Sequence, residues 1–569
     1  MIATIPAFMP VHQGEVTWSD FFCGAGGSSL GLHHVPGMRV KYALNHWDLA
    51  VQAHNANFPD TDHEVTVIEA VHPSRFGRTD CAWFSPSCTS HAYCGPRGND
   101  DESVRSRATM WDVIRWTAHH RYDVVVIENV IEAKLWCDAP GHYEAALAAG
   151  KKGCSCGTTY DDWIAEMAKL GYSHQEVFFN SQHALVPQSR DRLYVVFWRE
   201  GIPTPDLDFA PPSYCSSCDD VVAGVQTWKP ATRGSVRDSP RCFEYGKFGE
   251  NYVYTCPECL SETAPGVVGS HSIIDHDLPI DTIGSRKRPI AANTRHRIRT
   301  GIQKVGLNKS VQLQVGGNLF ERPGYARLWS LDEPLRTVTT SKYMAVILRY
   351  GNAAMSMAGE PGPAVTTSED IALVMQNMEN NIPRPDAIPT PPVTTGGNHM
   401  LLTMRNNSSG QAMDQPAPSV AAQGQHHGYL VYNGTPGHVR EFGQPAGTVK
   451  TKDSQSVIYP FRDGNALRSD VEPAAALTEK KQQALLEISE ADIDDMLFRM
   501  LDWTELQRAQ AMHAMPDGSP YLLTARVKGA NGKFKDLNSK QRVRMIGNAV
   551  SSPVATMIGF AVADALAAA

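Results

Sequence analysis

The chain has 569 residues, of which 42% are hydrophobic and 20% are charged, and its net charge is −8. The length predicts two or three domains, and the composition is that of an ordinary soluble protein. No apolar run suits a membrane span and the first residues resemble no secretory signal, so we expect a protein of the reducing cytoplasm with no membrane partner.

A glycine-rich turn follows the first predicted strand. Residues 16–22 read as a buried strand, and residues 26–32 open a helix. Glycines at such a turn let a bound group approach the backbone and the helix amino terminus. The pattern is not Gly-x-Gly-x-x-Gly, which disfavours a nicotinamide dinucleotide, and a purely structural turn is the alternative. The candidate binding residues here are Phe22, Gly24, Gly26 and Gly27.

Two further strand ends carry reactive side chains. Cys88 follows Ser85-Pro86-Ser87, and Glu128 ends the apolar run of residues 124–127. A helix is predicted between them, from about residue 103 to 119. A cysteine on a loop is usually inert and Glu-Asn after a strand is often only a turn, so each is weak evidence alone.

The segment Gln188-Ser189-Arg190-Asp191-Arg192 precedes another predicted strand at residues 193–197. Further strands are predicted at 40–44 and 122–127, with helical stretches between them. This alternation predicts an α/β fold, a doubly wound Rossmann-like sheet, for residues 1–205.

Two Cys-x-x-Cys pairs, separated by 37 residues, follow this domain. Each tight turn presents two sulfurs to one ion, which favours a structural zinc site in a zinc ribbon at residues 206–272 over unrelated cysteines or a redox pair. The predicted ligands are Cys215, Cys218, Cys256 and Cys259. A second group has less regular spacing, and whether it binds a second zinc is left open: Cys137, His142, Cys154 and Cys156.

Basic residues are clustered despite the negative net charge. Residues 285–309 contain eight Lys or Arg and no acid, and residues 526–544 form a second basic stretch. Such stretches can neutralise phosphates, and a solvated face is the alternative.

A repeat follows the first basic stretch. Pro334-Leu335-Arg336-Thr337-Val338-Thr339-Thr340 is echoed four times, with valines 27 to 29 residues apart. Each unit predicts two short strands and a turn, so residues 273–485 are expected to form a β-rich repeat region. A purely structural β module is the alternative.

The last segment, residues 486–569, is expected to complete the first domain. It contains Gly547-Asn548-Ala549-Val550, and a helix is predicted from about residue 553 to pack on the sheet.

Five segments resemble, in this order, motifs of the cytosine-C5 DNA methyltransferases. They are the glycine-rich turn, the Cys88 segment, Glu128-Asn129-Val130, the 188–192 segment and the 547–550 segment. The resemblance covers roughly the first 200 residues and the last 80 or so. It implies S-adenosylmethionine as cofactor, with Phe22 against the adenine and double-stranded DNA as partner. By position it adds His46, Trp47, Pro86 and Asn548 to the cofactor-binding residues.

The family chemistry needs these residue types together. A thiolate, here Cys88, adds to C6 of cytosine so that C5 becomes nucleophilic. A carboxyl group, here Glu128, hydrogen-bonds the N3 edge and stabilises the charge of the adduct. By analogy, Arg190 and Arg192 hold the flipped base. The region between the 188–192 strand and the last motifs is the target-recognition domain in this family, so residues 273–485 are expected to read DNA.

Three positions depart from the family pattern. Ser87 and Thr89 stand where proline and glutamine are usual, and His46 stands where a glutamate grips the ribose. The adenine-contacting acid has no clear counterpart, Glu69 being slightly out of frame. A tRNA cytosine-C5 methyltransferase and a catalytically silent DNA-binding homologue are the alternatives. Restriction protection, phage self-modification and regulation would use the same chemistry.

Overall fold

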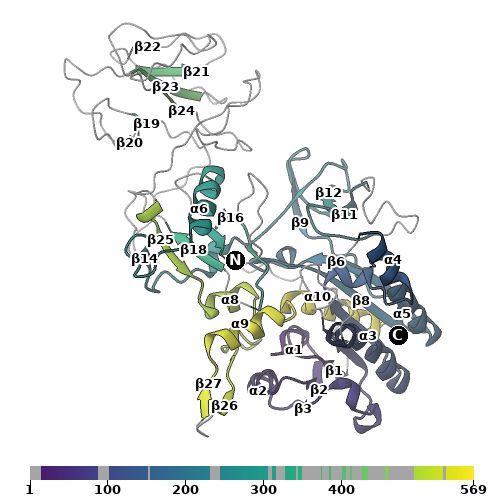
Figure 1. Ribbon diagram of the computed structural model, residues 1–569. Helices are drawn as coiled ribbons and strands as arrows, with labels where there is room; N and C mark the ends of the chain where they lie inside the picture. The colour runs from purple at the N-terminus through teal and green to yellow at the C-terminus, as the bar shows by residue number, and fades with distance from the viewer. Residues whose placement is uncertain are drawn as a thin grey trace.

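The computed structural model describes residues 14–87, 101–150, 154–230, 244–305, 310–315, 327–340, 344–348, 493–528 and 534–569, with isolated strands between 373 and 458 (Figure 1). Cys88 lies outside the described residues.

A seven-stranded sheet forms the centre of the first domain, in the order β3-β2-β1-β4-β5-β8-β6. Neighbours from β3 to β5 run parallel, and β8 is antiparallel to both β5 and β6. This mixed, mostly parallel α/β sheet confirms the fold class predicted for this part of the chain. The strands are β1 Val16–Phe21, β2 Met38–Asn45, β3 Asp62–Val65, β4 Cys81–Phe84, β5 Val124–Asn129, β6 Tyr172–Asn180 and β8 Asp191–Arg199.

Both faces of this sheet are buried, because alternate residues of each strand enter different cores. In β5, Val124 and Val126 pack in one core, while Val125 and Ile127 pack in the other. The first core is covered by α1 and α10, and the second by α3 and α5 (Figure 1). The helices of this domain are α1 Gly27–His33, α2 Asp48–Asn57, α3 Asp101–His120, α4 His142–Ala148, α5 Thr158–Lys169 and α10 Ser552–Ala567.

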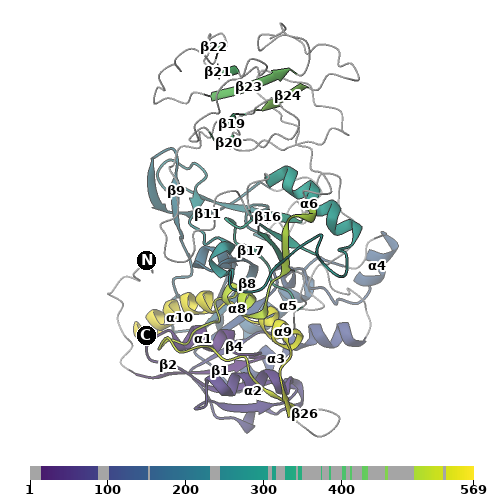
Figure 2. The same ribbon diagram turned by 90° about the vertical axis from the view of Figure 1, so that its left-hand side faces the viewer.

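The chain returns to this sheet through α10, which lies against α1 (Figure 2). The Thr556 hydroxyl donates to the carbonyl of Gly31 at 2.9 Å. The stretch Ser539–Ala567 is long and apolar enough to cross a membrane by composition, but 67% of its most apolar window is buried within the protein. Such burial is typical of a core helix.

A second sheet of five antiparallel strands has the order β14-β25-β18-β15-β16 and its own core with α6. Its elements are β14 Asp281–Thr282, α6 Ala292–Val305, β15 Val311–Gln314, β16 Leu328–Ser330, β18 Met344–Leu348 and β25 Leu497–Met500. The chain therefore adds β25 to this sheet before it returns to the first domain through α8 Trp503–Ala509, the hairpin β26 Arg526–Lys528 and β27 Phe534–Asp536, and α9 Ser539–Asn548.

The cysteine-containing module consists of two small antiparallel sheets, β10-β9-β13 and β11-β12. Their bounds are β9 Pro212–Cys215, β10 Asp220–Ala223, β11 Val225–Trp228, β12 Tyr252–Thr255 and β13 Ala264–Pro265. Strand β12 leads directly into the second cysteine pair.

The first copy of the repeat packs on the first domain. Its strand β17, Leu335–Arg336, pairs in parallel with β7, Gln188–Ser189, and the Thr337 hydroxyl donates to the Ser189 carbonyl at 2.9 Å. The other four copies lie outside the described residues. Between and after them the described strands are β19 Leu373–Val374, β20 Arg384–Pro385, β21 Met400–Met404, β22 Gln411–Ala412, β23 His426–Tyr432 and β24 Gln455–Ile458.

Candidate active site

The carboxyl ends of β2, β1, β4 and β5 meet at one edge of the sheet, because these strands are adjacent and parallel. Phe22 follows β1, His46 follows β2, Ser85 follows β4, and Glu128 lies at the end of β5. The strand order reverses between β1 and β4, and in open α/β sheets ligands bind at such a point. The structure thus brings the predicted cofactor and base-binding segments to a common edge.

The three predicted glycines have different surroundings. Gly24 has φ +55°, and a Cβ added there would meet no atom of the described residues within 4 Å. At Gly26, with φ +95°, a Cβ would lie 2.5 Å from the Tyr521 hydroxyl, and at Gly27 it would lie 2.3 Å from the Val550 carbonyl oxygen. Gly24 therefore faces space that a ligand can enter, whereas Gly26 and Gly27 allow the last segment to close on the turn.

Asp20, which the sequence reasoning missed, lies beneath this turn. It is fully buried, and its Oδ2 accepts hydrogen bonds from the hydroxyls of Ser28 and Ser29, both at 2.6 Å. Burial raises the pKa of the Asp20 carboxyl to about 6. An acid at the end of a buried strand, followed by two serines in the first turn of a helix, is the sequence signal for this arrangement.

The second strand end offers an aromatic and apolar surface. The Trp47 ring is half-buried, and the Arg544 guanidinium lies 4.6 Å from its centroid. His46 is exposed, as is Asn548 at the end of α9. Val65 and Val67, which follow along the same edge, are each 47% exposed.

The stem of the Cys88 segment is fixed by hydrogen bonds. The Ser87 amide donates to the Thr109 hydroxyl at 3.2 Å, and the Ser106 hydroxyl donates to that of Ser87 at 2.8 Å. The Asn129 side chain donates through Nδ2 to the carbonyl of Pro86 at 3.4 Å, and Pro86 is buried. Where the resemblance expects proline to stiffen the chain, side chains of α3 and β5 therefore hold it.

Glu128 forms an ion pair with Arg192. The distance from Arg192 Nε to Glu128 Oε1 is 2.9 Å, and the two side chains are 13% and 10% exposed. Arg192 also donates through Nη1 to the carbonyl of Asp191 at 2.7 Å. Because the pairing of β5 with β8 sets both backbones, the carboxylate and the guanidinium are held at the edge of the sheet.

Arg190 occupies a different environment from Arg192. It is 4% exposed, and its guanidinium donates to the carbonyls of Gly547 and Ala549, both at 3.2 Å. The resemblance assigned both arginines to the base. In the structure Arg190 joins the 188–192 segment to the last motif, and Arg192 alone of the two pairs with Glu128.

Comparison with known proteins agrees with this geometry. Residues 16–233 match the family described as C-5 cytosine-specific DNA methylase. This part of the chain is similar to that family. We call residues 16–233 the methylase domain.

Among curated relatives, type II methyltransferase M.HgiDI of Herpetosiphon aurantiacus is 25% identical over 185 residues, which are 32% of this chain and 52% of that protein. Type II methyltransferase M.SsoII of Shigella sonnei is 23% identical over 197 residues, 34% of this chain and 45% of that protein. The chain thus spans about half the length of these relatives. Among solved structures, the S. pombe Dnmt2 methyltransferase is 17% identical, with a TM-score of 0.25 over 33% of this chain and 53% of that one.

The four predicted zinc ligands lie together in the cysteine-containing module. Their sulfur atoms are all within 4.8 Å of one another, with 3.5 Å between Cys215 and Cys259 and 3.9 Å between Cys218 and Cys256. The residue after each pair is left-handed, Asp219 with φ 54° and Leu260 with φ 62°, so the two turns have the same form.

This module packs on the seven-stranded sheet beside Arg192. The backbone N–H of Phe248 donates to Asp191 Oδ1 at 3.0 Å, and the Gln226 side chain donates through Nε2 to the Phe178 carbonyl at 2.9 Å. The Trp228 ring meets that of Phe178 edge-on, with 5.5 Å between centroids. The position of Asp191 therefore depends on the module.

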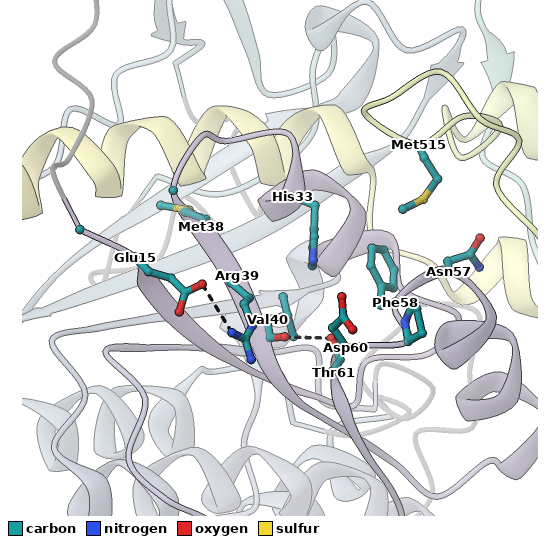
Figure 3. Close-up of a pocket in the computed structure, with 13 residues that line it drawn as sticks. Glu15, His33, Met38, Arg39, Val40, Asn57, Phe58, Asp60, Thr61 and Met515 are labelled. Atoms are coloured by element: carbon teal, nitrogen blue, oxygen red, sulfur yellow. Dashed lines mark hydrogen bonds and ion pairs between the residues drawn. The ribbon is translucent and has the colours of Figure 1, made fainter.

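A cavity of about 540 Å³ lies at the opposite edge of the sheet (Figure 3). It is lined by residues at the amino ends of β1, β2 and β3, including Glu15, Arg39 and Asp60. Because it lies at the amino ends of the strands, this cavity is separate from the edge that carries Phe22 and Glu128.

The first basic stretch serves packing as well as surface charge. Arg297 is buried and donates to the Val315 carbonyl at 2.8 Å, and Arg295 forms an ion pair with Asp494 at 2.7 Å. Lys287 and Arg288 are exposed. The charge available to a phosphate backbone is thus smaller than the sequence count predicts.

Proposed function

We propose that this protein transfers a methyl group from S-adenosylmethionine to C5 of cytosine in double-stranded DNA, through a covalent adduct with Cys88. The observation that carries the proposal is the Glu128–Arg192 ion pair, 2.9 Å long, beside the fixed stem of the Cys88 segment.

Each residue has one task in this reaction. The Cys88 thiolate adds to C6 of the base, and the electron pair of the C5–C6 double bond becomes available at C5. Glu128 hydrogen-bonds the N3 edge and stabilises the charge that the adduct places on the ring. Arg192 orients Glu128 through their ion pair and contacts the base. Once C5 carries the methyl group that the cofactor would supply, loss of the C5 proton to solvent and of the Cys88 sulfur as thiolate restores the aromatic ring.

The residues at the ends of β1, β2 and β3 fit an adenosyl cofactor. Gly24 leaves open space at the backbone, and Trp47, Val65 and Val67 supply an apolar surface for a purine. Phe22 and Pro86 would border the same site, and His46 and Asn548 are exposed polar groups within it. The cofactor supplies the methyl group. The cofactor would be held by Phe22, Gly24, His46, Trp47, Pro86 and Asn548, while Gly26 and Gly27 support the turn.

DNA contact is assigned to the β-rich region at 273–485, with exposed basic residues such as Lys287 and Arg288 near its start. Sequence reading by a second domain fits a reaction on a base that must leave the duplex. Because the relatives' names identify type II methyltransferases, protection of DNA in a restriction-modification system is the proposed setting.

The four cysteines Cys215, Cys218, Cys256 and Cys259 are assigned to one structural zinc ion. Four thiolates close the coordination sphere of zinc, so the ion would have no position for a substrate. The small sheets around it bury few side chains of their own, and metal binding would supply folding energy. Its function would be to fix the module that contacts Asp191.

The test is mass spectrometry of nucleosides from plasmid DNA and from total RNA of cells that express the protein. The variants are Cys88→Ala and, as a matched control in the same segment, Cys94→Ala. C5-methylated cytosine in the DNA of wild type and Cys94→Ala, but not of Cys88→Ala, is expected. Methylation confined to RNA, or no methylation in either nucleic acid, would overturn the proposal in favour of the tRNA enzyme or the silent homologue.

A further inference from the structure

A second cluster of metal-ligating side chains lies in the methylase domain itself. Cys137 follows η3 (Ile131–Leu135), His142 begins α4, and Cys154 and Cys156 precede α5. The Cys156 sulfur lies 3.3 Å from that of Cys137, 3.3 Å from that of Cys154 and 3.5 Å from His142 Nδ1. All four ligand atoms lie within 4.8 Å of one another.

These separations suit one zinc ion. With Zn–S of about 2.3 Å and Zn–N of about 2.0 Å, the ligand atoms of a tetrahedral site lie roughly 3.5–3.8 Å apart. The sulfur atoms are too far apart for a disulfide bond, which requires about 2.05 Å. Three thiolates and one imidazole form a closed set of four protein ligands, which is typical of a structural site.

The connection between Cys137 and Cys154, which contains α4, has little core of its own in its described residues. Among the seven residues of α4, all of them described, Ala146 alone is buried. A connection that buries so little apolar surface needs another source of stability, and a metal ion supplies it in small modules.

The cluster is connected to the stem of the Cys88 segment by side-chain contacts. Asp138, next to Cys137, accepts hydrogen bonds from Trp136 Nε1 at 2.5 Å and from Arg107 Nε at 2.8 Å, and its amide donates to the Thr159 hydroxyl at 2.7 Å. Arg107 lies in α3, next to Ser106, whose hydroxyl donates to Ser87. Ser87 immediately precedes Cys88.

We propose that Cys137, His142, Cys154 and Cys156 bind a second structural zinc ion, and that this ion keeps Asp138 on Arg107 and thereby positions the start of the Cys88 segment. The first part stands without any assumption about activity. The second part rests on the proposed function of Cys88.

Zinc content of the purified full chain, measured by plasma mass spectrometry, tests the site. We expect two zinc ions per wild-type chain, one in Cys137→Ser/Cys156→Ser, one in Cys215→Ser/Cys218→Ser, and none when all four changes are combined. One zinc ion in wild type that Cys215→Ser/Cys218→Ser removes would overturn the second site. So would a Cys137–Cys156 disulfide found in the wild-type chain under non-reducing conditions.

A conservative variant separates ligand loss from misfolding. His142→Ala is expected to lose one zinc ion, whereas His142→Cys, which restores a fourth ligand, is expected to retain two. If His142→Ala also retains two, histidine is not a ligand and the proposed ligand set is wrong.

Hydrogen exchange tests the link to Cys88 independently of activity. In His142→Ala, the amides of residues 106–112 are expected to exchange at least tenfold faster than in wild type, and His142→Cys should restore the slow rate. Asp138→Asn should keep both zinc ions yet show the same faster exchange and a lower kcat at unchanged KM for the cofactor. Loss of zinc from His142→Ala with unchanged exchange would refute the link, and absence of methylation in wild type would refute the proposed function while leaving the zinc count intact.

Discussion

The two halves of the carboxyl edge of the sheet are built by different physical means. At the end of β1, atoms of separate segments approach so closely that glycine is required, as at Gly27 against Val550. At the ends of β5 and β8, a nearly buried ion pair between Glu128 and Arg192 is the main feature. The cofactor half is thus defined by excluded volume and the base half by charge.

This difference predicts how each half responds to substitution. Added volume in the first half opposes closure of the last segment, and the cost appears as lost stability and cofactor binding. A charge removed from the second half changes the stabilisation of a reacting base, and the cost appears as lost rate. Four experiments test that separation, from the largest expected effect to the smallest.

Glu128→Gln should reduce the single-turnover methylation rate by about 10³-fold, within the usual range for removal of an acid–base group. The amide has nearly the size of the carboxyl group, so the cofactor Kd should change little. Glu132→Gln, which alters an acid on the following turn, is the matched control and should keep the wild-type rate. A Glu128→Gln enzyme as fast as wild type would remove this carboxyl group from the mechanism.

Gly27→Ala should lower the free energy of unfolding by about 3 kcal/mol, because the new methyl group meets the backbone of Val550 in a packed site. Gly24→Ala is the control: its left-handed backbone costs about 1–2 kcal/mol, but the methyl group enters open space. Gly24→Ala should therefore weaken cofactor binding more than its stability loss explains. Urea unfolding and calorimetric titration measure both, and the opposite ranking would contradict the separation of roles.

Asp20→Asn should change how stability depends on pH. The ordinary pKa of this carboxyl group is 3.8, and in the folded chain its pKa is about 6. The folded chain therefore holds the proton more strongly than the unfolded chain. Stability from this group is therefore greatest below pH 4 and falls as pH rises to 6, by about 3 kcal/mol at 1.36 kcal/mol per pKa unit. The variant should lack that fall in urea unfolding between pH 4 and 7; an unchanged pH slope would show that Asp20 is not the group responsible.

The neighbouring arginines provide the smallest and most direct comparison. Arg190→Gln removes two hydrogen bonds to the last motif and should cost about 2 kcal/mol of stability at a nearly normal kcat. Arg192→Gln should instead lower kcat about 100-fold with a smaller loss of stability. Thermal unfolding measures the stability of each variant and steady-state kinetics measures its kcat. A larger loss of kcat in Arg190→Gln and a larger loss of stability in Arg192→Gln would contradict this prediction.

Local patterns predicted the elements of the first domain because each carries its own periodicity. Strands expected at 40–44, 122–127 and 193–197 are β2, β5 and β8, and the helix expected at about 103–119 is α3. The strand order, and with it the meeting of Phe22 and Glu128 at one edge, came from the structure. Zinc, the domain boundaries and the roles of the site residues stay predictions.

Contacts between distant segments could not be predicted from local sequence patterns. The first repeat copy, expected in a β array, pairs with β7 instead, because a two-residue strand carries no information on its partner. Arg190 and Arg192 look alike in sequence, yet only the structure shows one of them turned to the carbonyls of residues 547 and 549. The replacement of a stiff proline by hydrogen bonds to Ser87 depends in the same way on the packing of α3.

The contact between α1 and α10 has a consequence for synthesis on the ribosome. Thr556 and Gly31 lie 525 residues apart, so at roughly 5–20 residues per second their contact waits roughly half a minute to two minutes after Gly31 is made. During that interval one face of α1 has no partner. The nascent chain therefore keeps an apolar surface available to chaperones, and the glycine-rich turn closes only after Tyr521 and Val550 have been made.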